Sequence, residues 1–147
     1  MTLDIREVSY SINNNDLIQE INFSIQEGES WAIMGLNGAG KTTLLKVLCN
    51  YLKPTQGFVE LKHKALTKYT AKELAKIMAY VPQDFPTEFP FSVEEFILMG
   101  RYAWQNGLFY QKQDFETVDQ VIAELNLKDF RKRKLGSLSG GERQRVL

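Results

Sequence analysis

The stretch that decides the fold is GLNGAGKT, residues 35–42. It fits the pattern G-x-x-x-x-G-K-[ST], with a short apolar run, SWAIM (30–34), before it and a helix-forming run, TTLLKVLCNYL (42–52), after it. A nearly continuous apolar run of this length is typical of a strand buried on both faces of a sheet. A buried strand, a glycine-rich loop and a helix in this order predict a loop that binds the phosphates of a nucleotide.

Each residue type in the loop has a chemical reason. The glycines let the backbone turn tightly with positive φ where needed, so that successive N–H groups point inward as an anion nest. The lysine supplies a cation for the β- and γ-phosphates, and the first threonine offers a hydroxyl to Mg²⁺. The predicted nucleotide contacts are Gly35, Asn37, Gly38, Ala39, Gly40, Lys41, Thr42 and Thr43. The loop alone does not distinguish a kinase, a GTPase, a helicase or a transporter motor.

A second glycine-rich stretch, SLSGGERQRVL, occupies residues 137–147. Ser139 and Glu142 have the S-x-x-E spacing of a capping box, which predicts a helix beginning at Gly140. Glycine costs about 1 kcal/mol relative to alanine in a helix, so the pair Gly140–Gly141 is expected where a ligand approaches the backbone closely. The N–H groups there, with the helix dipole, favour an anion. The alternative is a capped helix start without a ligand.

The remaining pattern predicts a front part of mixed strands and helices and a helical part beginning near Asp84. Alternating apolar residues predict two antiparallel strands, 3–12 with a possible bulge and 21–25, joined by a turn at 13–16. Short strands are predicted at 57–61 and 79–83, and a loop at 84–91. Capping boxes at Thr70/Glu73 and Ser92/Glu95 predict two helix starts, and helical spacing of apolar residues predicts a further helix over 115–125.

Bulk properties exclude several classes of protein. Lysine plus arginine number 18 and aspartate plus glutamate number 18, so the net charge of zero argues against a general nucleic-acid binder. The basic run KDFRKRK (128–134) is interpreted as a solvated helix end or turn. Cys49 is the only cysteine, and both it and His63 are expected to be structural. The chain shows no leader peptide and no apolar stretch of about 18 residues, which predicts a soluble, cytoplasmic protein.

The combination of GLNGAGKTT, VPQ and LSGGERQRV resembles the ATP-binding cassette (ABC) family over nearly the whole chain. The resemblance implies an α/β fold: a phosphate-loop NTPase core of ABC type with an antiparallel β subdomain and a helical subdomain. Residues 1–147 would form one incomplete nucleotide-binding domain. The core and β subdomain would occupy 1–83, and the helical subdomain 84–147, ending in the signature helix.

The resemblance also implies roles for individual residues, with ATP and Mg²⁺ as cofactors. Two subunits pair head to tail in this family, so the signature residues Ser139, Gly140, Gly141 and Glu142 would contact the nucleotide held by a partner's Lys41. Gln83 matches the glutamine that meets Mg²⁺ together with Thr42, although a polar turn residue is the alternative. Tyr10 matches the aromatic residue that stacks on adenine, although a packed strand tyrosine is the alternative. The phenylalanines of the 84–91 loop (Phe85, Phe89 and Phe91) would lie either in the core or against the permease.

The subgroup is indicated by the stretch SVEEFILMGRY (92–102), which is followed by GLF. This stretch is similar to that of ATP-binding subunits that drive import of iron–siderophore, haem or cobalamin complexes. Zinc and manganese importers have a similar sequence here. The implied partners are a second ATP-binding subunit, transmembrane permease subunits and, indirectly, a substrate-binding protein, with the chain peripheral on the inner face of the membrane. The alternatives are a module that binds nucleotide without hydrolysis, an ABC ATPase without a membrane partner and, last, a phosphate-loop kinase.

In the family, an aspartate for Mg²⁺, the catalytic glutamate and a switch histidine follow the signature helix, and none of them is present in these 147 residues. General-base help is worth about 10²–10⁴ in rate, so the 147 residues as written are expected to bind ATP without useful turnover. The core strands carried by the same region are also missing. The 147 residues are therefore expected to be either a poorly stable fragment or the front part of a longer protein.

Overall fold

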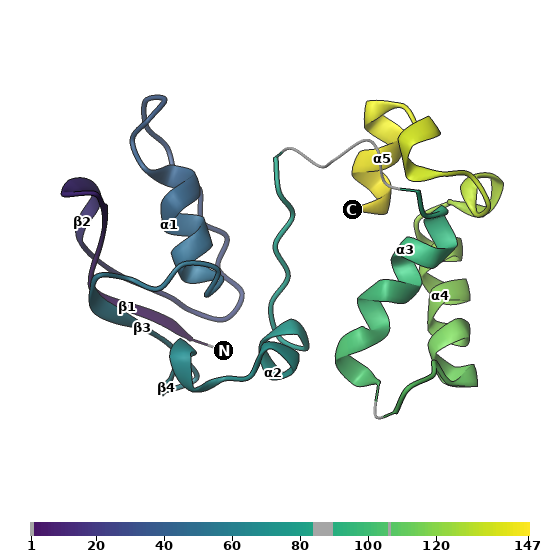
Figure 1. The fold of residues 1–147 in the computed structure, drawn as a ribbon, viewed down its shortest axis with the longest axis horizontal. Helices are drawn as coiled ribbons and strands as arrows, with labels where there is room; N and C mark the ends of the chain where they lie inside the picture. The colour runs from purple at the N-terminus through teal and green to yellow at the C-terminus, as the bar shows by residue number, and fades with distance from the viewer. Residues whose placement is uncertain (1, 84–89, 106) are drawn as a thin grey trace. The chain divides into compact units, whose positions relative to one another are not determined.

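The computed structural model describes residues 2–83, 90–105 and 107–147. The chain forms two compact units, an N-terminal unit, Met1–Leu74, and a C-terminal unit, Ala75–Leu147 (Figure 1). The short helix α2 (Ala71–Ala75) crosses the boundary between them, and its predicted capping box at Thr70 and Glu73 is confirmed by both reciprocal hydrogen bonds. Among the described residues, no helix has the length and apolar character needed to cross a bilayer.

The N-terminal unit is built on an antiparallel sheet with the strand order β2-β1-β3-β4. The strands are β1 (Leu3–Ile12), β2 (Asn15–Ile25), β3 (Gln56–Leu61) and β4 (Lys64–Ala65). The predicted hairpin between the first two strands and the predicted strand at 57–61 are confirmed. β4 was not predicted from the sequence, and it returns through a tight turn in which Lys62 and His63 both have positive φ.

The predicted bulge in the first strand is also confirmed. The pairing of β1 with β2 shifts register between Ile5 and Val8, with Glu7 at φ 49°, and both apolar side chains stay buried. On the other side of the bulge, a Cβ at Gly57 would lie 2.2 Å from the carbonyl oxygen of Arg6 and 2.3 Å from that of Glu7. The bulge therefore brings the backbone of β1 so close to β3 that only glycine fits opposite it.

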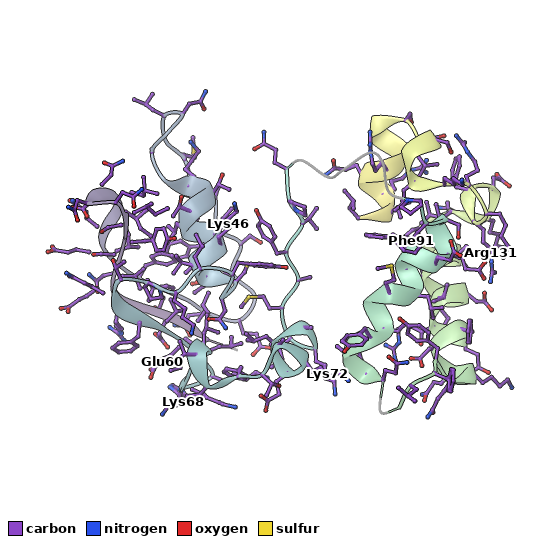
Figure 2. The ribbon with its side chains drawn as sticks, viewed as in Figure 1. Lys46, Glu60, Lys68, Lys72, Phe91 and Arg131 are labelled. Carbon is purple, nitrogen blue, oxygen red and sulfur yellow. The ribbon has the colours of Figure 1, made fainter. Side chains whose placement is uncertain are left out.

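Helix α1 (Lys41–Leu48) buries Leu44, Val47 and Leu48 and leaves Lys46 exposed (Figure 2). It ends earlier than residue 52, the predicted end. Asn50 takes a left-handed conformation, and the backbone N–H groups of Tyr51 and Leu52 turn back to the carbonyl oxygen of Lys46. Such a cap satisfies the orphan carbonyl groups of a helix end before Pro54 is reached.

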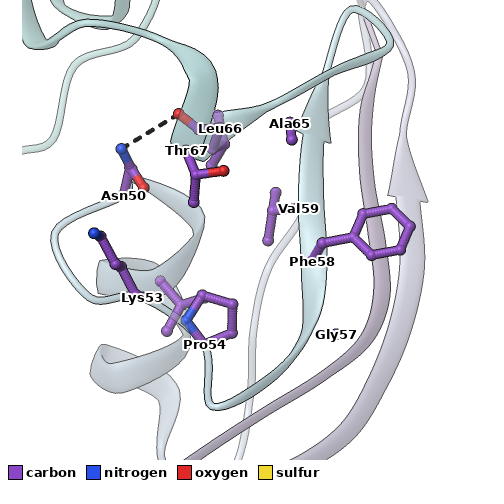
Figure 3. Close-up of a pocket in the computed structure, with 10 residues that line it drawn as sticks. Asn50, Lys53, Pro54, Gly57, Phe58, Val59, Ala65, Leu66 and Thr67 are labelled. Carbon is purple, nitrogen blue, oxygen red and sulfur yellow. Dashed lines mark hydrogen bonds between the residues drawn. The ribbon is translucent and has the colours of Figure 1, made fainter.

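A pocket of about 240 Å³ lies beside the end of α1, against β3 and the 3-10 turn η1 (Leu66–Lys68) (Figure 3). The amide of Asn50 donates to the carbonyl oxygen of Leu66 at 3.5 Å across one side of it. The lining residues are Val47, Asn50, Lys53, Pro54, Gly57, Phe58, Val59, Ala65, Leu66 and Thr67.

Two predicted strands are wrong. Residues 30–34 have no strand pairing, and they are exposed: Met34 is 90% exposed and Trp31 53%. Residues 79–83 likewise form no strand. A strand buried on both faces needs neighbouring strands for its N–H and C=O groups, and among the described residues neither segment belongs to a β-sheet. Trp31 is instead held locally, stacked on Phe23 with ring centroids 5.2 Å apart and donating from Nε1 to Glu29.

The C-terminal unit is helical, as predicted for this part of the chain. Its elements are α3 (Val93–Met99), η2 (Gly100–Trp104), α4 (Lys112–Glu124), η3 (Lys128–Phe130), η4 (Leu135–Ser137) and α5 (Gly140–Val146). The predicted capping boxes at Ser92/Glu95 and Ser139/Glu142 are both formed. Its core consists of Val93, Val118, Ile122, Leu127, Leu135, Leu138 and Val146.

Arg101 makes a polar anchor in this unit. Its Nε lies 3.0 Å from Oδ1 of Asp114, and its guanidinium lies over the ring of Trp104. The backbone N–H of Gln111 and the Arg101 guanidinium both donate to Asp114, and they hold the pKa of that buried carboxyl below its usual value. Asp114 therefore fixes both the start of α4 and the turn η2.

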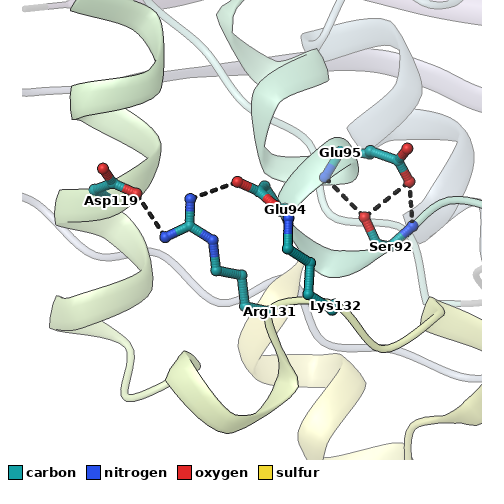
Figure 4. A network of polar contacts seen from close by, with 6 residues as sticks. All are labelled: Ser92, Glu94, Glu95, Asp119, Arg131 and Lys132. Carbon is teal, nitrogen blue, oxygen red and sulfur yellow. Dashed lines mark hydrogen bonds and ion pairs between the residues drawn. The ribbon is translucent and has the colours of Figure 1, made fainter.

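The basic run 128–134 is not simply solvated, contrary to its interpretation from the sequence. Arg131 bridges Glu94 at the start of α3 and Asp119 in the middle of α4, and Lys132 also pairs with Glu94 (Figure 4). Hydrogen bonds donated by the side chains of Arg131 and then Lys132 lower the pKa of Glu94 from 4.5 to about 2. The run is therefore a clamp between two helices, formed with acidic residues distant in sequence.

Candidate nucleotide site

The glycine-rich loop has the backbone that a phosphate cradle needs. Gly38 and Gly40 have φ of 83° and 82°, which L side chains rarely adopt, whereas Gly35 does not. A Cβ at Gly40 would lie 2.4 Å from the carbonyl oxygen of Leu17 and 2.7 Å from Cγ2 of Ile18. Gly40 is therefore required twice, by its conformation and by the close approach of the loop to β2.

Lys41 is held inside the loop by the loop itself. Its Nζ donates to the carbonyl oxygens of Gly35 at 2.9 Å and Leu36 at 2.7 Å. An ammonium group has three donors, so one donor remains for a ligand oxygen. The backbone N–H of Ala39 donates to the same Leu36 carbonyl at 3.2 Å, which closes the turn below it. The loop thus positions a cation at its centre.

The N-terminus of α1 faces the same loop. Gly40 is its N-cap residue, no side chain caps it, and its first turn has no acidic residue. The positive end of the helix dipole is therefore available to an anion from outside the helix. Thr42 is exposed and Thr43 half-buried at this end, and Asn37 is exposed in the loop. The described residues contain no cluster of three or more His, Cys, Asp or Glu for a metal.

Tyr10 is connected to the loop through β2. It is half-buried on β1 and stands opposite Ile18 in the register. Ile18 is one of the two β2 residues that lie against Gly40. The structure therefore brings Tyr10 and the glycine-rich loop to the same part of the N-terminal unit, and the adenine contact remains a prediction.

Unlike Gly40, the pair Gly140–Gly141 is required neither by a positive φ nor by close packing. Gly140 and Gly141 begin α5 without positive φ, both are exposed, and a Cβ at either would meet nothing within 4 Å. Nothing in the described part of the chain thus demands glycine here. Ser139 Oγ accepts from the N–H of Glu142, and the Glu142 carboxylate accepts from the N–H of Ser139. The capping box thus occupies the N–H of Glu142, while the N–H groups of Gly140 and Gly141 make no hydrogen bond within the described residues.

The other predicted site residues are placed less fully. Gln83 is exposed in the C-terminal unit, as is Phe91, while Phe85 and Phe89 lie outside the described residues. Gln83 and the Ser139–Glu142 motif belong to a different unit from the glycine-rich loop, and their roles remain predictions. No predicted site residue lines the pocket beside α1. The basic run 128–134 was not predicted as part of a site, because its acidic partners lie far along the chain.

Comparison with known proteins identifies the family of the chain. The family described as ABC transporter matches residues 18–147. HmuV of Rhodopseudomonas palustris (strain BisA53), named as a hemin import ATP-binding protein, is 39% identical over 144 residues, 98% of this chain and 52% of the relative. A second relative is YusV of Bacillus subtilis (strain 168), which is named as a probable siderophore transport system ATP-binding protein. It is 39% identical over 131 residues, which are 88% of this chain and 48% of the relative.

A solved structure of an inward-facing ABC transporter, assigned to the metal-chelate type, matches 99% of this chain and 52% of its own chain, with 30% identity and a TM-score of 0.77. The chain therefore spans about half the length of these proteins. The family match covers most of the chain, including the glycine-rich loop and the Ser139–Glu142 motif. The chain belongs to the ABC transporter family.

Proposed function

We propose that this chain is the nucleotide-binding part of an ATP-binding subunit that drives import of an iron chelate, haem or a cobalamin-type complex. The observation that carries the proposal is the glycine-rich loop. Its own carbonyl groups hold Lys41, and it packs against β2 at a position where only glycine fits. The names of HmuV and YusV support haem or siderophore complexes as the cargo class.

The residues divide the work of binding. The N–H groups of the loop and of the start of α1, with Lys41, bind and orient the β- and γ-phosphates of ATP. Thr42 and, by the family resemblance, Gln83 would hold Mg²⁺, which would neutralise charge on the phosphates. Tyr10 stacks on the adenine. Ser139, Gly140 and Gly141 close over the nucleotide of a second subunit, which is consistent with the open space above them.

The partners proposed for the whole protein are a second ATP-binding subunit, transmembrane permease subunits and, through these, a substrate-binding protein. The protein would work at the inner face of the membrane, where ATP hydrolysis is coupled to uptake. A zinc or manganese importer subunit is a second candidate, because the 92–102 stretch is similar to those importers too. Uptake of radiolabelled haem, ferric siderophore and zinc by cells lacking the gene, with and without complementation, separates these cargoes.

Nucleotide binding is tested with Lys41→Ala in the full-length protein by isothermal titration calorimetry. A charged hydrogen bond to phosphate contributes about 1.5–3 kcal/mol, so ATP affinity should fall roughly 10- to 150-fold. The matched control is Lys46→Ala, because Lys46 is exposed on the same helix and outside the loop. Affinity lost equally in both variants, or in neither, would contradict the proposal. A protein that binds ATP normally without turnover would instead be the non-hydrolysing module.

A further inference from the structure

Arg133 lies where the basic run meets the segment leading into α5. One guanidinium nitrogen donates to the carbonyl oxygen of Ser137 at 2.7 Å, and the other lies 3.7 Å from Oε1 of Glu142. The guanidinium also lies over the ring of Phe130. A planar fork of donors can hold two acceptors in one geometry, which a flexible ammonium cannot do. Arg133 thus touches the segment both before and after Ser139.

Glu142 links Arg133 to Ser139, the first residue of the Ser139–Glu142 motif. Its Oε2 accepts from the backbone N–H of Ser139 at 2.7 Å, while Oε1 faces Arg133. The Ser139 N–H and hydroxyl, and then the nearby charges of Arg133 and Arg145, lower the pKa of Glu142. The carboxylate therefore remains ionised and holds Ser139 on one oxygen and Arg133 on the other.

The backbone of Arg133 is fixed to the rest of the C-terminal unit. Its carbonyl oxygen accepts from the N–H of Val93, the fully buried first residue of α3, at 3.0 Å. The neighbouring residue Lys134 forms a β-bridge with Ser92, and the N–H of Leu135 donates to the carbonyl oxygen of Phe91. The Arg133 side chain therefore reaches the signature motif from a rigid frame.

We propose that Arg133 is a positioning residue for the Ser139–Glu142 motif, which it orients for contact with the nucleotide of a second subunit. This inference rests on the proposed function. Arg133 is 43% exposed and Glu142 24%, so their ion pair contributes little to stability in solvent. The contacts instead select one orientation of the first turn of α5 relative to α3. Arg133 acts through Glu142 and Ser137 and touches no nucleotide itself.

The test uses Arg133→Gln in the full-length protein and measures two affinities. Binding of ATP to a single subunit should change less than about twofold, because the glycine-rich loop is untouched. Association of two subunits at saturating ATP, measured by sedimentation equilibrium, should weaken about three- to tenfold for each Arg133 that is replaced. This is the effect expected from the loss of one to two hydrogen bonds. Arg133→Lys, which keeps the charge without the fork, should fall between wild type and Arg133→Gln.

The matched control is Arg131→Gln. Arg131 is in the same run and is 36% exposed, but it pairs with Glu94 and Asp119 and not with the signature motif. Its loss should lower the melting temperature and leave ATP-dependent association unchanged. The proposal is overturned if Arg133→Gln associates like wild type, or if Arg131→Gln weakens association as much as Arg133→Gln does.

Lys41→Ala separates this test from that of the proposed function. If the wild type binds no ATP, or if Lys41→Ala binds it equally well, the proposed function fails. If ATP binding depends on Lys41 and wild-type subunits associate with ATP, then an unaffected Arg133→Gln overturns the positioning role alone.

Discussion

Replacing Glu94 with glutamine should destabilise the C-terminal unit in a way that depends on pH. Glutamine keeps the size of the side chain and removes the charge that Arg131 and Lys132 share. Arg131 keeps Asp119 as a partner at 2.7 Å, so the substitution removes one arm of the clamp and leaves the other. The side chain of Glu94 is only 17% exposed, so water replaces the lost contacts incompletely.

The magnitude follows from the lowered pKa. Hydrogen bonds from Arg131 and then Lys132 bring the pKa of Glu94 from 4.5 to about 2. At about 1.36 kcal/mol per pKa unit, this sets an upper limit of about 3 kcal/mol on the contribution to stability. Lys132 is 80% exposed and Arg131 36%, so solvent screening reduces the pairing energy. We expect Glu94→Gln to lower the free energy of unfolding at pH 7 by about 1–2 kcal/mol.

The sign of the pH dependence is fixed. A carboxyl whose pKa is lower in the folded state binds more protons when unfolded, so its contribution is complete above the unfolded pKa and is lost on acidification. The difference between wild type and Glu94→Gln should therefore be constant above about pH 5 and disappear towards about pH 2.

Urea unfolding followed by circular dichroism at several pH values measures this difference. The control is Glu116→Gln, because Glu116 forms an exposed pair with Lys112 on α4 and should contribute at most about 0.5 kcal/mol. A Glu94→Gln difference that is absent at pH 7, or equally large at pH 7 and pH 3, would refute the reasoning.

Three further outcomes are expected. Gly141→Ala should leave the free energy of unfolding unchanged or raise it by up to about 1 kcal/mol, because a Cβ there meets nothing. The same substitution should weaken ATP-dependent association measured by sedimentation. Normal association would contradict a contact between Gly141 and a ligand from outside. Gly40→Ala should lower the free energy of unfolding, measured in urea, by about 1–3 kcal/mol because of its positive φ. The clash of the new Cβ with Leu17 should add to this loss. Wild-type stability would show that the loop approaches β2 less closely. Cys49 should react more slowly with a disulfide reagent at pH 8 than free glutathione does, because burial raises the pKa of its thiol; equal rates would contradict this.

Local sequence rules predicted the elements whose causes are local. The phase slip between Ile5 and Val8 located the bulge, because side chains must return to the buried face after an extra residue. The three capping boxes were found from residues three positions apart. The pattern G-x-x-x-x-G-K-[ST] located the loop, although only two of its three glycines have positive φ.

The failures have non-local causes. The runs 30–34 and 79–83 have strand composition, but strand formation depends on neighbouring strands that the described residues do not provide. The basic run 128–134 looked solvated because its acidic partners, Glu94 and Asp119, are distant in sequence. Likewise, the carbonyl groups that hold Lys41 are backbone atoms and have no sequence signature.

The placement of the two tryptophans has an optical consequence. Trp31 stacks on Phe23 in the N-terminal unit, and Trp104 lies under the guanidinium of Arg101 in the C-terminal unit. The chain has two tryptophans in total, so each unit carries one tryptophan in its own surroundings. Single-tryptophan versions, with phenylalanine at the other position, would report each unit separately. Trp31 lies four residues before the glycine-rich loop, so its emission could follow nucleotide arrival without any attached dye.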